Sequence, residues 1–250
     1  METLLKRDRV IIFVSLVGIT ALAWLYLVNQ ARSMDMPMSA AEMAAMTPQG
    51  PMGFLLTFLM WLVMMIGMML PSAAPMILLF NTVSRRHKEQ GQPYVATSVF
   101  TFGYLLVWGG FSLVATIIQT GLNHAALLSP AMASTSPILG GALFIATGIY
   151  QWTPLKNACL GKCRSPLDFI MHHWRTGTRG AFLMGLIHGA FCLGCCWLLM
   201  GILFIGGVMN LMWVAGITAF LLVEKLLPQG VWVGRFVGFA MILAGAIILL

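Results

Sequence analysis

Long apolar segments separated by short polar ones are the feature that most constrains how this chain can fold. A helix needs roughly 20 apolar residues to cross the hydrocarbon core of a bilayer, because each residue adds about 1.5 Å along its axis. Seven segments approach or exceed this length, and each predicts a membrane helix: 10–29, 53–80, 94–118, 137–152, 181–205, 209–227 and 231–250. The fourth is short and Gly-rich, so it either extends toward Ser134 or does not cross fully. The predicted fold class is an all-α, polytopic transmembrane helical bundle of about seven spans.

The composition excludes a water-soluble domain of this length. Apolar residues make up 60% of the 250 residues and charged residues only 8%, whereas soluble domains carry about a quarter charged residues. Most of the surface must therefore face lipid. The sequence contains no phosphate-binding loop, dinucleotide fingerprint or zinc-protease motif, so we predict no nucleotide cofactor and no catalytic residues. A binding or transport role is favoured over an enzyme.

The distribution of basic residues predicts the orientation, since Lys and Arg concentrate in cytoplasmic loops. With a cytoplasmic N-terminus, all 14 Lys and Arg residues except Arg32 fall on the cytoplasmic side. We therefore predict a multi-pass protein of a bacterial inner membrane with a periplasmic C-terminus. The formal net charge of +7 then reflects orientation and does not indicate a nucleic-acid partner.

Hydropathy divides the chain into three parts. The apolar run within residues 1–29 exceeds the roughly 7–15 residues of a secretory signal, so it predicts a retained signal-anchor helix. A Met-rich periplasmic segment at 30–52 follows. Residues 53–250 form the predicted bundle, which includes a long cytoplasmic loop at 153–180.

The fifth apolar segment carries an imidazole and three thiols at helical spacing. His188, Cys192, Cys195 and Cys196 stand at positions i, i+4, i+7 and i+8, and so share one face of a helix. Ionisable groups at membrane depth are costly, which favours a functional role such as binding a soft metal ion. The alternative is that the thiols behave as small apolar side chains and His188 makes one ordinary hydrogen bond.

Helix geometry limits how these four side chains could share an ion. His188 and Cys196 lie about 12 Å apart along the axis, too far for one ion to bind all four. Two adjacent sites of low coordination are favoured, one at His188 with Cys192 and one at Cys192 with Cys195 or Cys196. Each site would need a ligand from another helix.

The second apolar segment offers such ligands. Met64 and Met68 lie on a methionine stripe, and thioethers are soft, neutral ligands that suit Cu(I). Pro71 and Pro75 follow and should break or kink the helix, which frees carbonyl groups that Ser72 or a protein-lined cavity must satisfy. The alternative is a stripe that only packs the core.

Methionines also alternate in the predicted periplasmic segment, at Met34, Met36 and Met38. This spacing is typical of an exposed arm that captures Cu(I) or Ag(I). A loop without a ligand role, or a helix that lies on the lipid surface, explains the pattern equally well.

The predicted cytoplasmic loop contains Cys159 and Cys163 four residues apart. Neighbouring cations should favour their thiolate forms and create a docking point for a soft metal, although incidental cysteines in a basic loop are the alternative.

Glu224 and Lys225 lie at the end of the sixth apolar segment. We predict a gating or proton-relay role, or a helix-end ion pair of Glu224 with Lys225, Arg235 or His188.

Four motifs resemble those of a bacterial family of uncharacterised proteins described as predicted metal-binding integral membrane proteins. They occur in order as MMLPSAAPM, YQWTPLKNACLGKCRSPL, HGAFCLGCCW and VEKLLP. The similarity runs from about residue 53 to the C-terminus, so the Met-rich segment lies outside it. The resemblance implies metal binding, and it implies neither a substrate nor a mechanism.

Together these patterns predict a membrane protein that binds a soft metal ion, Cu(I) above others, for transport or for delivery to a membrane metalloenzyme. A soluble metallochaperone is a second possible partner. The first alternative is a thiol-disulfide electron carrier that uses Cys192 and Cys195 with Cys159 and Cys163. The second is an assembly subunit of a membrane complex, in which the sulfur-bearing residues only pack the core.

Overall fold

A computed structural model describes residues 2–34, 50–91, 95–125, 127–128 and 136–250. Helices account for nearly all of the described residues, so the predicted all-α class is confirmed. The helices are α1 (Glu2–Met34), α3 (Gly50–Glu89), α4 (Thr97–His124), α5 (Pro137–Tyr150), α6 (Pro154–Arg164), α7 (Pro166–His173), α8 (Gly177–Gly201), α9 (Leu203–Gly206), α10 (Leu211–Leu226) and α11 (Gly230–Leu249).

Among the described residues, five helical segments are long and apolar enough to cross a membrane. They are Arg7–Arg32, Gly50–Glu89, Thr97–His124, Gly177–Gly206 and Gly230–Leu249. Helix α5 is apolar but has only 14 residues, and α10 has 16. These two rise about 21 and 24 Å, short of the roughly 30 Å of a hydrocarbon core. A multi-pass membrane protein is thus supported, whereas length alone does not establish seven spans.

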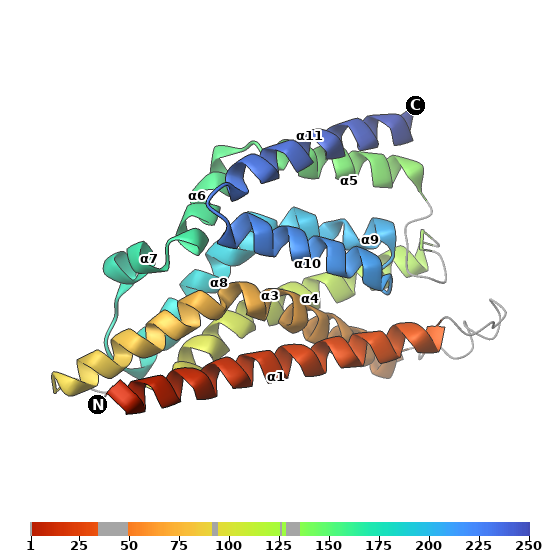
Figure 1. Ribbon diagram of the computed structural model, residues 1–250. Coiled ribbons are helices and arrows are strands. Elements are labelled where there is room, and N and C mark those ends of the chain that lie inside the picture. Colours follow the sequence, from red (N-terminus) through yellow and green to blue (C-terminus); the bar gives the residue numbers. More distant parts are fainter. Residues whose placement is uncertain (1, 35–49, 92–94, 126, 129–135) are drawn as a thin grey trace.

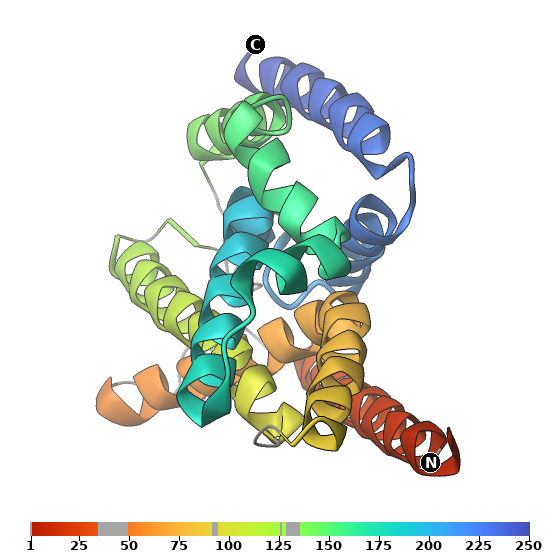
Figure 2. The ribbon, with the colours of Figure 1, turned by 90° about the vertical axis from the view of Figure 1, so that its left-hand side faces the viewer.

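The long helices run along a common direction and reverse from one to the next (Figure 1). They pack chiefly in pairs, α1 on α3, α4 on α8, and α5 on α11. Helix α8 lies at the centre and contacts α4, α5, α6 and α10, and Figure 2 shows it between the α5–α11 pair and the α1–α3 pair. The central position of α8 explains why its predicted ligand residues face protein.

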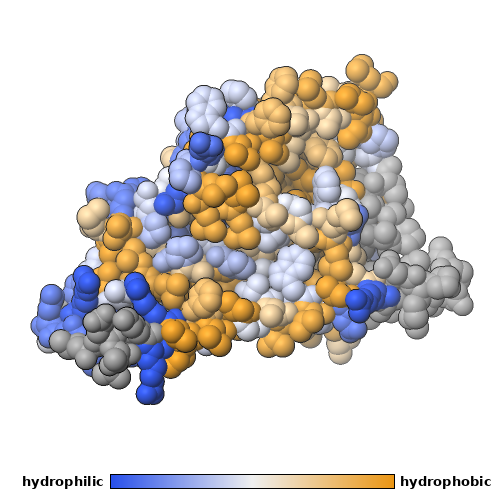
Figure 3. Space-filling view, in the orientation of Figure 1, coloured by the Kyte–Doolittle hydropathy of each residue, from blue (hydrophilic) through white to orange (hydrophobic). Residues whose placement is uncertain are grey.

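The outward faces of the bundle are apolar. Trp232, Phe236 and Ile247 of α11 are at least 70% exposed, as expected for a face covered by lipid. Hydrophilic residues gather mainly at the end where the N-terminus lies (Figure 3). This surface pattern suits a protein embedded in a bilayer.

Helix α3 continues through Pro71 and Pro75 and bends near its middle (Figure 1). Proline has no N–H, so Pro71 leaves the carbonyl of Gly67 without its usual helical partner. The indole of Trp24 on α1 donates to that carbonyl at 3.3 Å. The predicted kink is present, and its freed carbonyl is satisfied by Trp24 rather than by Ser72, which donates to Met69 O instead.

The predicted loop at 153–180 contains two helices that sequence reasoning did not predict. Pro154 and Pro166 begin α6 and α7, and proline is favoured at the first position of a helix. The Thr153 side chain caps α6 by accepting from Lys156 N. Helix α6 packs against α8, and this contact brings the two groups of cysteines together.

Candidate metal site

Helix α8 holds its predicted ligand residues in the protein interior. His188 and Cys192 are each 2% exposed, and Cys195 and Cys196 are fully buried. The thiols of Cys195 and Cys196 donate to the carbonyl of Cys192, at 3.1 and 2.9 Å. The four side chains thus line one inward face of the helix.

Helix α6 adds two thiols to the three of α8. Cys163 interacts directly with the side chains of Cys192 and Cys195. One turn earlier, the Sγ atom of Cys159 lies 2.9 Å from where a Cβ would stand on Gly194. A side chain at this position of α8 would require that sulfur to move. All five cysteines therefore meet between α6 and α8, and all five are free thiols.

The α6 cysteines do not have the thiolate character predicted for them. Contact with the thiols of Cys192 and Cys195, together with burial, raises the pKa of Cys163 well above the usual range. Burial and then Cys195 raise the pKa of Cys159. The cations next to these cysteines in the sequence interact with other groups and not with the thiols. Lys162 pairs with Asp168 at 2.8 Å, and Arg164 donates to the carbonyls of Leu227 and Pro228.

Lys225 extends into the group of five cysteine side chains between α6 and α8, called the thiol cluster below. Its Nζ atom lies 3.1 Å from Cys192 Sγ, 3.2 Å from Ser72 Oγ and 3.9 Å from Met69 Sδ. The residue is only 5% exposed. The predicted ion pair between Lys225 and Glu224 is therefore wrong, because the ammonium group turns inward toward sulfur and hydroxyl groups.

Glu224 pairs instead with Lys156 of α6, at 2.5 Å, and both side chains are 1% exposed. Lys156 also donates to the side chain of Gln151. The predicted pairing of Glu224 with Arg235 or His188 is likewise wrong, since Arg235 lies over the rings of Trp152 and Trp232. A buried ion pair thus fixes α6 to α10 beside the thiols.

Tyr104 of α4 also touches the cluster, although its sequence position gave no signal of a role. Its hydroxyl lies 3.2 Å from Cys192 Sγ and donates to the carbonyl of Met69 at 3.2 Å. Cys192 therefore contacts groups from α4, α6 and α10, and is the residue on which the cluster converges.

His188 is enclosed by aromatic rings. The ring centroids of Phe100, Tyr104 and Phe169 lie 6.0, 5.8 and 5.1 Å from that of the imidazole. Its Nδ1 atom is buried and has no hydrogen-bond partner. His188 is thus a buried ring one turn from Cys192 with a nitrogen that makes no hydrogen bond.

The methionine stripe is buried in the core. Met64 and Met68, the predicted ligands, are both fully buried. On the same helix, Met69 Sδ lies 3.9 Å from the Nζ atom of Lys225, which itself contacts Cys192 Sγ. Met36 and Met38 of the predicted capture arm lie outside the described residues, as does the side chain of Met34, the last residue of α1.

In the part of the chain that the structure describes, no three His, Cys, Asp or Glu side chains are arranged as a closed metal site. The cluster instead offers pairs of sulfurs from two helices. Thiolates are soft ligands that favour Cu(I). Two sulfurs can hold Cu(I), whereas a structural zinc site takes four ligands. The donor set thus fits a soft ion of low coordination number.

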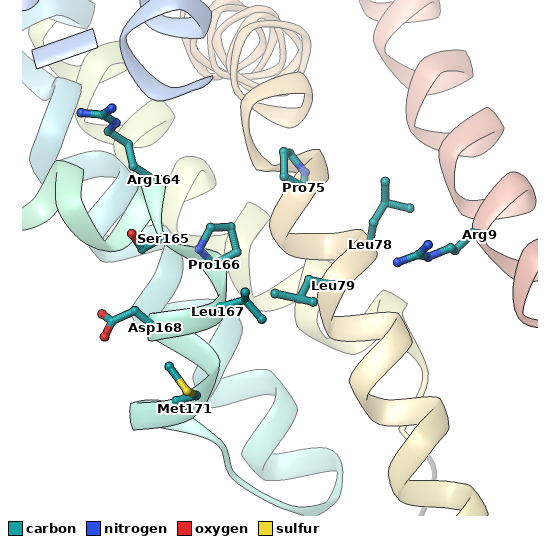
Figure 4. Close-up of a pocket in the computed structure, with 10 residues that line it drawn as sticks. All are labelled: Arg9, Pro75, Leu78, Leu79, Arg164, Ser165, Pro166, Leu167, Asp168 and Met171. Atoms are coloured by element: carbon teal, nitrogen blue, oxygen red, sulfur yellow. The ribbon is translucent and has the colours of Figure 1, made fainter. Parts of the chain in front are cut away.

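A groove of about 860 Å³ opens beside this region, near the N-terminal part of α1. Arg164, Ser165 and Pro166 line one side of it, and Pro75 of α3 and Arg9 of α1 lie opposite (Figure 4). Arg164 directly follows Cys163 in sequence. None of the five cysteines lines the groove.

Comparison with known protein families gives a match over most of the chain. A model of the PpoB2 family, described as copper chaperone, matches residues 58–248. The matched region includes all five cysteines, His188 and Lys225. No curated protein and no solved structure shows a significant match.

Proposed function

The chain belongs to the PpoB2 copper chaperone family, and from this premise we propose that it binds Cu(I) between α6 and α8 inside a membrane and delivers it to a membrane metalloenzyme. The observation that carries the proposal is the meeting of Cys163 with Cys192 and Cys195. These thiols come from two helices, so a bound ion would link α6 to the centre of the bundle.

The arrangement supports transfer by exchange of one thiolate at a time. Cys159 is half-buried, whereas Cys192 and Cys195 are buried. A soluble donor with exposed thiols could pass Cu(I) to Cys159, then to Cys163, then to the α8 thiols. Each step keeps the ion bound to sulfur, so it never enters water. The predicted capture arm would bind Cu(I) at the periplasmic end of this route, through Met34, Met36 and Met38.

We further propose that seven helices cross the membrane, with the N-terminus in the cytoplasm. The alternating helix directions support this (Figure 1), as does the concentration of basic residues in loops that share one end of the bundle. In this orientation α6, with Cys159 and Cys163, lies toward the cytoplasm. The short helices α5 and α10 would cross where the protein itself thins or shields the bilayer.

Anaerobic elemental analysis tests the proposal. The protein is purified in detergent with a reductant, loaded with Cu(I) and washed with a competing chelator. We expect bound copper in the wild type, and at least about a tenfold weaker affinity in Cys163→Ser/Cys192→Ser, because both helices lose a ligand. His124→Ala, at the end of α4, is the matched control. Equal copper in the cysteine variant and the wild type would contradict the proposal.

The same contact favours a second function, thiol-disulfide exchange. Cys163 lies beside Cys192 and Cys195, so a disulfide between α6 and α8 would need little movement. A Cys195→Ser variant that accumulated a mixed disulfide with another protein would support this function. Copper bound under reducing conditions, where no disulfide persists, would support the first.

A further inference from the structure

The position of Lys225 bears on which ion the cluster can hold. Its ammonium group lies 3.1 Å from Cys192 Sγ, and Cys195 and Cys196 are also within electrostatic range of it. A buried ammonium is costly unless an anion balances it. Among the described residues, no carboxylate forms a salt bridge with Lys225, because Glu224 pairs with Lys156. The groups closest to the ammonium that could carry a balancing charge are therefore the sulfurs of α8.

The charges near the cluster can be summed from the residues that face it. Lys156 and Glu224 form a close, buried pair and cancel. When two thiols bind the ion as thiolates and the other three stay neutral, these thiolates and Lys225 carry a net charge of minus one. A monovalent cation makes this group neutral, whereas a divalent cation leaves an uncompensated positive charge in a medium of low dielectric constant.

We propose that Lys225 is the specificity-determining residue that reserves the thiol cluster for a monovalent soft cation and excludes divalent ions such as Zn(II). The inference rests on the proposed function, because it assumes that two of the clustered thiols bind the ion. Lys225 itself does not ligate the metal. Its fixed charge replaces the second positive charge that a divalent ion would bring.

Coordination adds to the charge effect. Zn(II) takes four ligands in structural sites, and the described residues contain no such group of His, Cys, Asp and Glu side chains. The Nζ atom also occupies the space beside Cys192, Ser72 and Met69. Replacing Lys225 with a neutral side chain would remove its charge from this space.

Metal competition tests the role of Lys225. The full-length protein in detergent, kept anaerobic, is equilibrated with Cu(I) and Zn(II), and separately with Ag(I) and Zn(II), and bound metal is measured by elemental analysis. We expect the wild type to bind Cu(I) and Ag(I) in preference to Zn(II). In Lys225→Leu, which keeps an apolar side chain, removes the charge and adds no metal ligand, this preference should fall by at least about tenfold. Lys225→Arg should retain it.

Lys162→Leu removes a cation from α6 outside the cluster and serves as the control, with selectivity expected to be unchanged. Lys225→Gln repeats the neutral test if Lys225→Leu is not recovered folded. A wild type that binds Zn(II) as well as Cu(I) overturns the inference, and so does a Lys225→Leu protein with unaltered selectivity. Failure of the proposed function is a different result, in which the wild type binds no Cu(I) that depends on Cys192.

Discussion

The pKa of the Cys163 thiol depends on residues of α8 more than on those of its own helix, α6. Its own segment is basic, which alone would favour a thiolate, yet the thiols of Cys192 and Cys195 raise its pKa well above the usual range. Burial and Cys195 act in the same direction on Cys159. A raised pKa means that the neutral thiol persists to higher pH. Cu(I) binding at neutral pH should therefore release protons from α6.

Alkylation of the α6 cysteines should show this raised pKa directly. A variant with Cys192, Cys195 and Cys196 replaced by Ser lacks the interacting thiols, so its α6 cysteines serve as the comparison. Only the thiolate reacts, so in metal-free wild type the α6 thiols should react more slowly than in that variant. Their rate should still rise with pH above about 8.5, where an ordinary thiol is half ionised.

Mass spectrometry after labelling at a series of pH values measures the rate at each cysteine. The same protein unfolded in denaturant gives the rates of accessible thiols. If Cys163 reacts in the folded wild type with an ordinary pH midpoint, then its contact with the α8 thiols does not exist in solution.

At the scale of the elements, the cluster depends on how closely α4 and α8 approach. A Cβ on Gly185 would collide with the carbonyl oxygen of Phe100, so the two backbones touch at this point. This approach places Tyr104 against Cys192. The close contact between α4 and α8 therefore helps to form the site.

Gly185→Ala should destabilise the protein by about 1–3 kcal/mol, because the helices must move apart to admit a methyl group. We expect a lower midpoint of thermal unfolding and weaker Cu(I) binding. Gly110→Ala on α4 is the matched control, since a Cβ there has no neighbour within 4 Å. Equal midpoints for the two variants would show that the α4–α8 contact does not support the site.

The sequence predicted the elements better than their contacts. Hydropathy located the apolar helices, and helical spacing placed His188 and the α8 thiols on one buried face. The α6 helix was missed because it is short and polar, and its meeting with α8 depends on tertiary packing. One sequence-based expectation for Lys225 was a helix-end ion pair with Glu224. Only the structure showed that its side chain points inward and contacts Cys192.

At the scale of the whole molecule, the helices that contribute to the site surround α8. The α4 helix packs on one side of it, while α6 and α10 close another through the buried Lys156–Glu224 pair. The outer helices α1 and α11 present apolar faces, as a lipid environment requires. The thiols thus lie inside the bundle and close to the end that we assign to the cytoplasm. This placement suits an ion that enters from one side and is held away from water.

The central claim is that α6 and α8 bind one Cu(I) together, and X-ray absorption at the copper edge tests it most directly. Wild-type protein loaded with one equivalent should show copper as Cu(I) in a shell of two or three sulfurs. Cys163→Ser should lose a sulfur from that shell, whereas His124→Ala should not. A shell dominated by nitrogen or oxygen in the wild type, or one unchanged by Cys163→Ser, would contradict the account.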